Sequence, residues 1–247
     1  MLQTIFKERV DLSPFNPKDK PNAFFGASTK FGDLNNDGVY RDFIRYNNTN
    51  IQAFAYDGNG KVHLLWEYYS AVEGSQQPNN YFYQFILWDI DNDGRTEVIG
   101  AFPTKSGSIE LRVLDGETGA VKSKFFTNIP NPTRSDRVKE TQIYITVANT
   151  RGLVQPQDIV LLVEINSQEN LFVFNENLAL LWDKTVNTPT QEKIHAHYTC
   201  NHNIEGDSKD EFRLQLRLER QLTESQHLQE RSHYLPNFRQ LIYKNVR

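Results

Sequence analysis

Short apolar and alternating segments separated by turn residues recur along this chain. Two alternating segments, Ile51–Tyr56 and Ile109–Leu114, each end at an Asp-Gly pair, which is a strong signal for a hairpin turn. No long segment with helical periodicity precedes the C-terminal tail. The pattern therefore predicts an all-β chain.

The same succession of segments recurs four times. Each unit has an acidic residue directly before an apolar, strand-like segment, and we name these residues the closing acids: Asp42, Glu97, Asp158 and Glu211. They recur at intervals of 55, 61 and 53 residues. Trp66 and Trp182 each lie 24 residues after their closing acid, which supports the third unit as a true repeat. A period of about 50–60 residues is close to the size of a four-stranded propeller blade.

We therefore expect a β-propeller of about four blade-like repeats, as an incomplete or truncated ring. The expected divisions are an extended leader at 1–22, blades at 23–219 with repeats near 31–70, 85–128, 143–186 and 195–219, and a tail at 220–247. The tail is either a short amphipathic helix or a segment foreign to the repeat. An unclosed array would expose sheet edges, which predicts self-association.

Acidic loops precede the strands of three units. The second loop places Asp89, Asp91 and Asp93 at alternate positions, followed by Gly94 for a sharp turn and Glu97 as the closing acid. Carboxylates packed this closely repel one another unless a cation lies between them, and hard oxygen ligands suit Ca²⁺. The sequence therefore predicts a structural Ca²⁺ in this loop.

The first and fourth loops repeat the pattern less completely. Their candidate ligands are Asp33, Asn35, Asp37 and Asp42 in the first, and Asn203, Glu205, Asp207 and Glu211 in the fourth. The third unit keeps only its closing acid. An EF-hand is excluded because its twelfth position, which requires Glu, is Ile44 in the first loop and Gly100 in the second. The alternative is that these loops are solvated β-turns without metal.

These loops, with the strand after each and the Asp-Gly hairpin beyond, resemble the FG-GAP or VCBS-type repeats of integrin-like β-propellers. The resemblance spans roughly Ala23 to Phe212 and implies structural calcium that pins hairpins within blades. It also implies a secreted or cell-surface protein, although residues 1–10 do not read as a signal peptide.

A narrower resemblance, to bacterial rhamnogalacturonan lyases, rests on three segments: residues 27–40, 83–94 and 200–204. It implies a calcium-decorated propeller that cleaves an acidic pectin backbone by β-elimination. The segment 100–107 departs from that family, so no catalytic residue is carried over. The expected function is a calcium-stabilised module that binds a carbohydrate or protein ligand, and the alternative is a polysaccharide lyase or an inactive fragment of one.

Charge and hydropathy limit the classes of partner that we expect. The formal net charge of −4 gives no basic face for nucleic acid, and no apolar segment is long enough to span a membrane. His195, His197 and His202 lie near the single cysteine, Cys200, but their spacing fits no structural zinc pattern. No nucleophile elbow, phosphate loop or dinucleotide fingerprint is present.

Overall fold

The computed structural model describes ten segments of the chain: residues 10–16, 27–47, 50–69, 84–104, 108–130, 142–165, 168–187, 192–202, 211–220 and 238–243. These residues form fifteen β-strands and one short 3-10 helix, with no α-helix among them. The predicted all-β class is confirmed. By its internal contacts the chain divides into two compact units, Met1–Asn131 and Pro132–Arg247.

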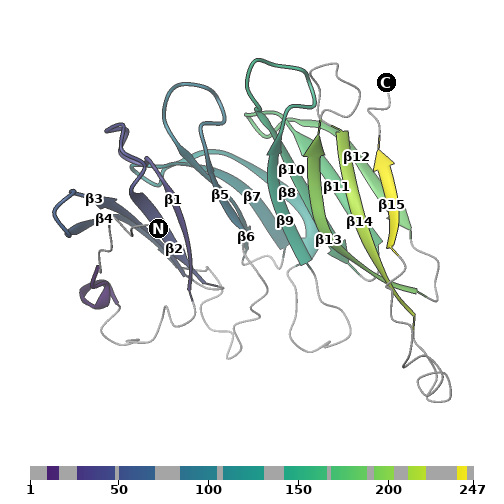
Figure 1. Cartoon of the computed structure of the whole chain (residues 1–247), viewed down its shortest axis with the longest axis horizontal. Helices are drawn as coiled ribbons and strands as arrows, with labels where there is room; N and C mark the ends of the chain where they lie inside the picture. The colour runs from purple at the N-terminus through teal and green to yellow at the C-terminus, as the bar shows by residue number, and fades with distance from the viewer. Residues whose placement is uncertain are drawn as a thin grey trace, which may run out of the picture. The chain divides into compact units, whose positions relative to one another are not determined.

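The first unit contains two four-stranded antiparallel sheets, each a simple meander (Figure 1). The strands of the first sheet are β1 (Ser28–Gly32), β2 (Asp42–Tyr46), β3 (Asn50–Tyr56) and β4 (Val62–Tyr69). Those of the second sheet are β5 (Phe85–Trp88), β6 (Glu97–Pro103), β7 (Ser108–Asp115) and β8 (Val121–Pro130).

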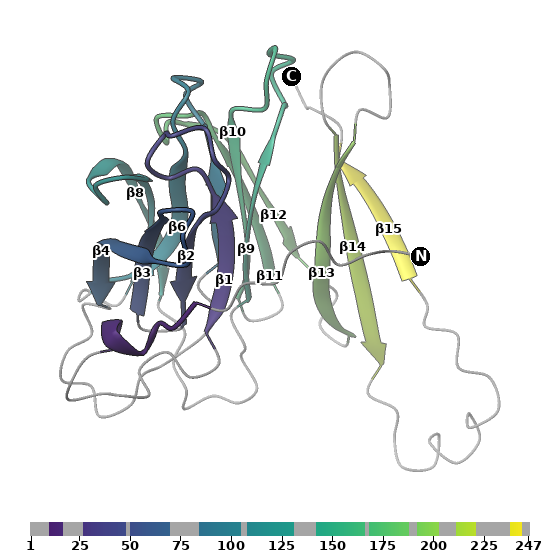
Figure 2. The same ribbon diagram turned by 60° about the vertical axis from the view of Figure 1, so that its left-hand side comes forward.

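The second unit contains one four-stranded and one three-stranded antiparallel sheet. Figure 2 shows the three strands of the smaller sheet side by side. The four strands are β9 (Gln142–Ala148), β10 (Asp158–Ile165), β11 (Gln168–Phe174) and β12 (Leu180–Asn187). The three are β13 (Glu192–His202), β14 (Glu211–Arg220) and β15 (Phe238–Tyr243). In each unit the first strands of the two sheets contact one another, β1 with β5 and β9 with β13.

The repeat appears in the strand boundaries. The four closing acids are the first residues of β2, β6, β10 and β14. The predicted Asp-Gly hairpins join β3 to β4 and β7 to β8, and Asp57 and Asp115 each accept hydrogen bonds from backbone N–H groups of their own turn. Side-chain bonds of this kind explain why Asp is favoured at such turns.

The two sheets of the first unit share one apolar core. One face of each sheet contributes to it, with Ile44, Ala53 and Trp66 from the first sheet and Val98 and Leu114 from the second among the buried residues. The indole Nε1 of Trp66 donates to the carbonyl of Gly116 at 2.8 Å, and the Tyr68 hydroxyl donates to the carbonyl of Gly119 at 2.7 Å. Strand β4 is thus fastened to the hairpin between β7 and β8.

The opposite face of the first sheet is covered by the N-terminal segment. The 3-10 helix η1 (Ser13–Phe15) lies within the predicted leader, and the Phe15 ring meets the Phe54 ring edge-on at 5.2 Å. Gln52 Nε2 donates to the Phe15 carbonyl at 3.0 Å, and Arg45 Nη2 donates to Asn16 Oδ1 at 3.1 Å. This part of the leader therefore packs against one face of the first sheet.

In the second unit, the four-stranded sheet has its own core, in which Val160, Leu162 and Val173 are buried and Trp182 packs against them. Residues 238–243 lie in the tail for which a helix or a foreign segment was expected, and they form strand β15, paired with β14. The aromatic and branched residues of this segment favour a strand over a helix. No described helix has the length and apolar character of a membrane span.

Candidate functional site

The first and second acidic loops fold in the same way. Asp33 and Asp89 each accept two backbone N–H groups, from the residues four and five positions later, at 2.9–3.1 Å. In each loop an Asn and a Gly take positive φ: Asn36 (57°) and Gly38 (82°) in the first, and Asn92 (59°) and Gly94 (87°) in the second. Asn and Gly tolerate this left-handed conformation best, so the loop shape follows from the local sequence.

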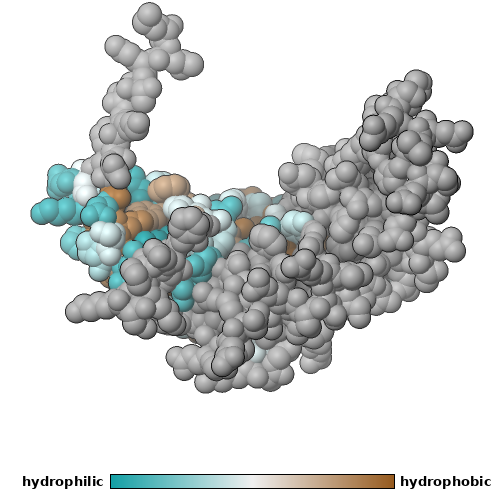
Figure 3. All heavy atoms as spheres, turned by 90° about the horizontal axis from the view of Figure 1, so that it is seen from below, coloured by the Kyte–Doolittle hydropathy of each residue, from teal (hydrophilic) through white to brown (hydrophobic). Residues whose placement is uncertain are grey.

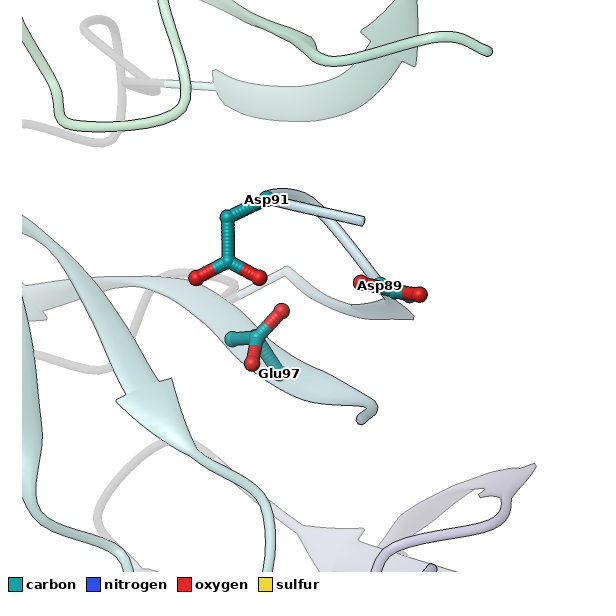
Figure 4. Close-up of side chains that lie close together, drawn as sticks. All are labelled: Asp89, Asp91 and Glu97. Carbon is teal, nitrogen blue, oxygen red and sulfur yellow. The ribbon is translucent and has the colours of Figure 1, made fainter. Parts of the chain in front are cut away.

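The second loop gathers its carboxylates. Ligand oxygens of Asp89, Asp91 and Glu97 all lie within 4.8 Å of one another, and no other such group of three His, Cys, Asp or Glu residues occurs in the described part of the chain. Figure 4 shows the carboxylates of Asp91 and Glu97 facing each other, with Asp89 set apart to one side of this pair. Glu97 is completely buried, whereas Asp89 and Asp91 are half-buried.

A lysine ammonium already lies among these carboxylates. Lys122 Nζ, from β8, donates to Asp91 Oδ2 at 2.7 Å and to Glu97 Oε1 at 2.8 Å, and it lies 3.5 Å from Asp93 Oδ2. The second oxygen of Glu97 accepts the Ile90 N–H at 3.0 Å. The buried carboxylate is therefore paired on both oxygens.

The electrostatics of this cluster follow from burial and from the ion pairs. Burial raises the pKa of Glu97, although the bonds from Lys122 and Ile90 act in the opposite direction. Burial also opposes the charge of Lys122, but the bonds to Asp91 and Glu97 outweigh it, so the pKa of Lys122 is raised. Lys122 is consequently a cation throughout the physiological pH range.

The oxygen donors of the second loop suit Ca²⁺, but the space between them is already filled. Asp91 Oδ1 is buried without a hydrogen-bond partner among the described residues, so one lone pair is open to a cation. The position between Asp91 and Glu97, however, is taken by Lys122. Calcium in this loop remains a prediction, and it would require Lys122 to move away.

The first loop offers oxygens without such a cation. Asp33 Oδ1 and Asn35 Oδ1 converge on the N–H of Asp37, both at 3.1 Å. No ion pair to Asp33 or Asp37 is found among the described residues. The closing acid Asp42 is turned to the backbone, because it accepts N–H groups from Leu34, Asn35 and Tyr56.

The third closing acid is also paired within the protein. Asp158 is completely buried and accepts the N–H groups of Thr150 and Arg151. The Arg151 side chain donates to Asp158 through Nε at 2.6 Å and to Glu176 through Nη2 at 2.7 Å. In this unit the cation paired with the closing acid is therefore an arginine side chain.

The fourth loop lies outside the described residues at Asn203, Glu205 and Asp207. Its closing acid, Glu211, begins β14 opposite His202. Strand β13 has a β-bulge between Ala196 and Tyr198, so the simple alternation expected for His195 and His197 is interrupted there.

Exposed aromatic rings lie at the same end of the first unit as the acidic loops. They are Phe31 on β1, Tyr40 in the first loop and Trp88 at the end of β5, exposed by 67, 77 and 40%. The ends of β1 and β5 are in contact, since a Cβ on Gly32 would lie 3.0 Å from the Leu87 side chain. Figure 3 views the opposite end, where the described residues present polar and apolar surface in a mixed pattern.

Lys122, Arg151 and this aromatic group were not predicted from the sequence as site residues. Arg151 had a local signal, because it is a basic residue in the third loop, whereas the first two loops are acidic. Tyr40 is conspicuous only as a large ring inside a polar loop. Lys122 had no local signal, because it lies 25 residues after Glu97 on another strand.

Comparison with solved structures finds a similar fold in three rhamnogalacturonan lyases. A rhamnogalacturonan lyase of Bacillus licheniformis (PL11) aligns over 75% of this chain with a TM-score of 0.53 and 19% sequence identity. The rhamnogalacturonan lyase YesW and the exotype rhamnogalacturonan lyase YesX each align over 75% of the chain, with TM-scores of 0.52 and 0.53 and 18% identity. These likenesses show the fold alone.

The alignment with these lyases is partial on their side. The matched region makes up 38–39% of the length of each of the three lyases. No family model and no curated protein matches the chain, so membership of the FG-GAP or VCBS repeats stays a prediction.

Proposed function

We propose that this chain is a β-propeller-type module that binds an acidic polysaccharide of the rhamnogalacturonan class. The observation that carries the proposal is the fold shared with three rhamnogalacturonan lyases. The sheets would be blades, because each is an antiparallel meander and the first strands of neighbouring sheets are in contact within each unit, as they are around a propeller axis.

The binding edge would be the loop end of the first unit. The exposed rings of Phe31, Tyr40 and Trp88 offer flat apolar faces on which sugar rings can stack. Arg41 and Arg95 are exposed in the two loops, and guanidinium groups pair well with the carboxylates of uronic acids. Rings and cations together suit a chain of acidic sugars.

Binding is tested by calorimetric titration with rhamnogalacturonan oligosaccharides. The Tyr40→Ala and Trp88→Ala variants should each raise the dissociation constant by about tenfold, the loss of one well-placed contact. Phe126→Ala is the matched control, because Phe126 is an exposed ring on β8 outside the two loops. Absence of binding by the unaltered protein would refute the proposal.

Lyase activity is the second candidate, and it is favoured because the three similar structures are lyases. Elimination creates a carbon–carbon double bond in the product, whose ultraviolet absorbance reports turnover directly. Absorbance that rises with time would make the chain an enzyme. A constant signal under conditions where binding is measured would leave it a binding module.

Calcium as a structural ion belongs to this proposal at the first loop. There Asp33 Oδ1 and Asn35 Oδ1 converge on the N–H of Asp37, and no described lysine or arginine is paired with Asp33 or Asp37. An ion bound only to the folded protein would raise its melting temperature.

A further inference from the structure

Lys122 supplies the positive charge that offsets the repulsion between the carboxylates of the second loop. Its ammonium group has three N–H donors and lies 2.7, 3.5 and 2.8 Å from oxygens of Asp91, Asp93 and Glu97. We propose that Lys122 is the resident cation of this loop and that it excludes a divalent ion from it. This inference goes beyond the proposed polysaccharide binding and does not depend on it.

A β-bulge directs Lys122 into the loop. The pairing of β7 with β8 shifts by one residue between Val113 and Leu114, and Lys122 is the residue passed over. The first and third sheets have the same bulge, where Leu65 and Leu181 are passed over. Only the second sheet, which has the clustered carboxylates, carries a basic residue at this position among the three four-stranded sheets.

The second sheet also differs from the first and third at the residue that follows the bulged one. Trp66 and Trp182 follow Leu65 and Leu181, and both pack against apolar cores. Ser123 follows Lys122. The second sheet has therefore exchanged a Leu-Trp pair for Lys-Ser, which gives up apolar packing at the point where a charge reaches the acidic loop.

Removal of Lys122 would leave the acidic cluster without its cation. Glu97 is completely buried and would lose one of its two partners, and Asp91 and Asp93 would repel it. An uncompensated buried carboxylate is costly unless a cation replaces the ammonium. The open lone pair of buried Asp91 Oδ1 would then be available to a divalent ion.

The test is thermal melting of Lys122→Met with a chelator and with Ca²⁺. With the chelator, the midpoint should fall by roughly 3–6 °C relative to the unaltered protein. Added Ca²⁺ should raise the midpoint of Lys122→Met by more than it raises that of the unaltered protein. Lys124→Met is the matched control, because Lys124 is an exposed lysine on the same strand and is paired with none of the loop carboxylates in the described structure.

Asp91→Asn separates the second loop from the first. In the unaltered protein this change should leave the Ca²⁺ response as it was, and in the Lys122→Met background it should abolish the extra response. A Ca²⁺ response in the first loop would be removed by Asp37→Asn in both backgrounds equally. The second-loop result is thus independent of whether the first loop binds the ion.

Two outcomes would overturn the proposal. One is a Ca²⁺ response of the unaltered protein that Asp91→Asn removes, because the ion would then bind beside Lys122. The other is a Lys122→Met protein whose midpoint matches that of Lys124→Met and shows no extra Ca²⁺ response. If Lys122→Met does not fold in either condition, the comparison of Asp91→Asn with the unaltered protein decides.

Discussion

At the residue scale, the carboxylate of the closing acid has a different set of hydrogen-bond partners in each of the first three units. Asp42 is bonded by backbone N–H groups alone, Glu97 by a backbone N–H and Lys122, and Asp158 by backbone N–H groups, Thr150 and Arg151. The change from Asp to Glu in the second unit has a geometric reason. That loop is one residue shorter between its first acid and its closing acid, and Glu is one methylene longer.

The ion pair of the third unit should make stability depend on acidity. Burial opposes the charge of Glu176, but the Arg151 side chain outweighs this effect and lowers the pKa of Glu176 below its ordinary 4.5. A lowered carboxyl pKa contributes stability that is present above the ordinary pKa and is lost as the pH falls through the lowered one. Glu176→Gln should therefore cost about 1 kcal/mol at neutral pH and nothing near pH ~2.

The measurement is urea unfolding of both proteins across this pH range. Glu117→Gln serves as control, because Glu117 lies exposed in the corresponding hairpin of the second sheet and has no ion pair in the described structure. A stability difference for Glu176→Gln that stays constant down to pH ~2 would contradict the pairing with Arg151.

At the element scale, the sequence predicts what is local and misses what depends on strand pairing. The loops and hairpins follow from Asn, Asp and Gly at fixed offsets, so the closing acids could be placed at strand starts from spacing alone. The position of Lys122 could not, since it depends on a bulge in a strand 25 residues after Glu97. Strand β15 was missed because no Asp-Gly turn precedes it, unlike β4 and β8.

The contact of Trp66 with the hairpin between β7 and β8, which we call the interlock between the two sheets of the first unit, is one of these non-local features. Trp66 packs on Gly119 and donates to the carbonyl of Gly116, so β4 is fastened to the hairpin after β7. A Cβ on Gly119 would lie 2.7 Å from Trp66 Cγ, and its φ of +71° disfavours other residues. The glycine thus serves both the turn and the contact between sheets.

Gly119→Ala should destabilise the protein by about 2–4 kcal/mol, from the clash with Trp66 and from the backbone strain. Gly58→Ala is the matched control, because Gly58 has a φ of +79° in the corresponding hairpin of the first sheet and nothing within 4 Å of its Cβ position. This control isolates the strain and should cost about 1–2 kcal/mol. Equal losses for the two variants, measured by urea unfolding, would contradict the interlock.

At the scale of the whole molecule, the first unit shows how the two faces of a sheet are covered. The first sheet uses one face for the core shared with the second sheet and presents Phe43, Phe54, Arg45 and Gln52 on the other. These four residues are nearly fully buried. In a repeat architecture such a face is covered by the next repeat or by a capping segment, and here the N-terminal segment contributes a cap.

Phe15→Ala tests this capping role. Phe15 is half-buried, its ring meets Phe54, and its carbonyl fixes Gln52, which in turn receives a bond from Arg45. Truncating the ring should cost about 1–2 kcal/mol of unfolding free energy, about half of the value for a fully buried aromatic residue. Ser13→Ala is the control on the same turn, because Ser13 is exposed. If urea unfolding gives the two variants the same stability, the face is held by other parts of the chain and the segment is not its cap. If only Phe15→Ala loses stability, the segment before the first strand is an integral part of the first unit.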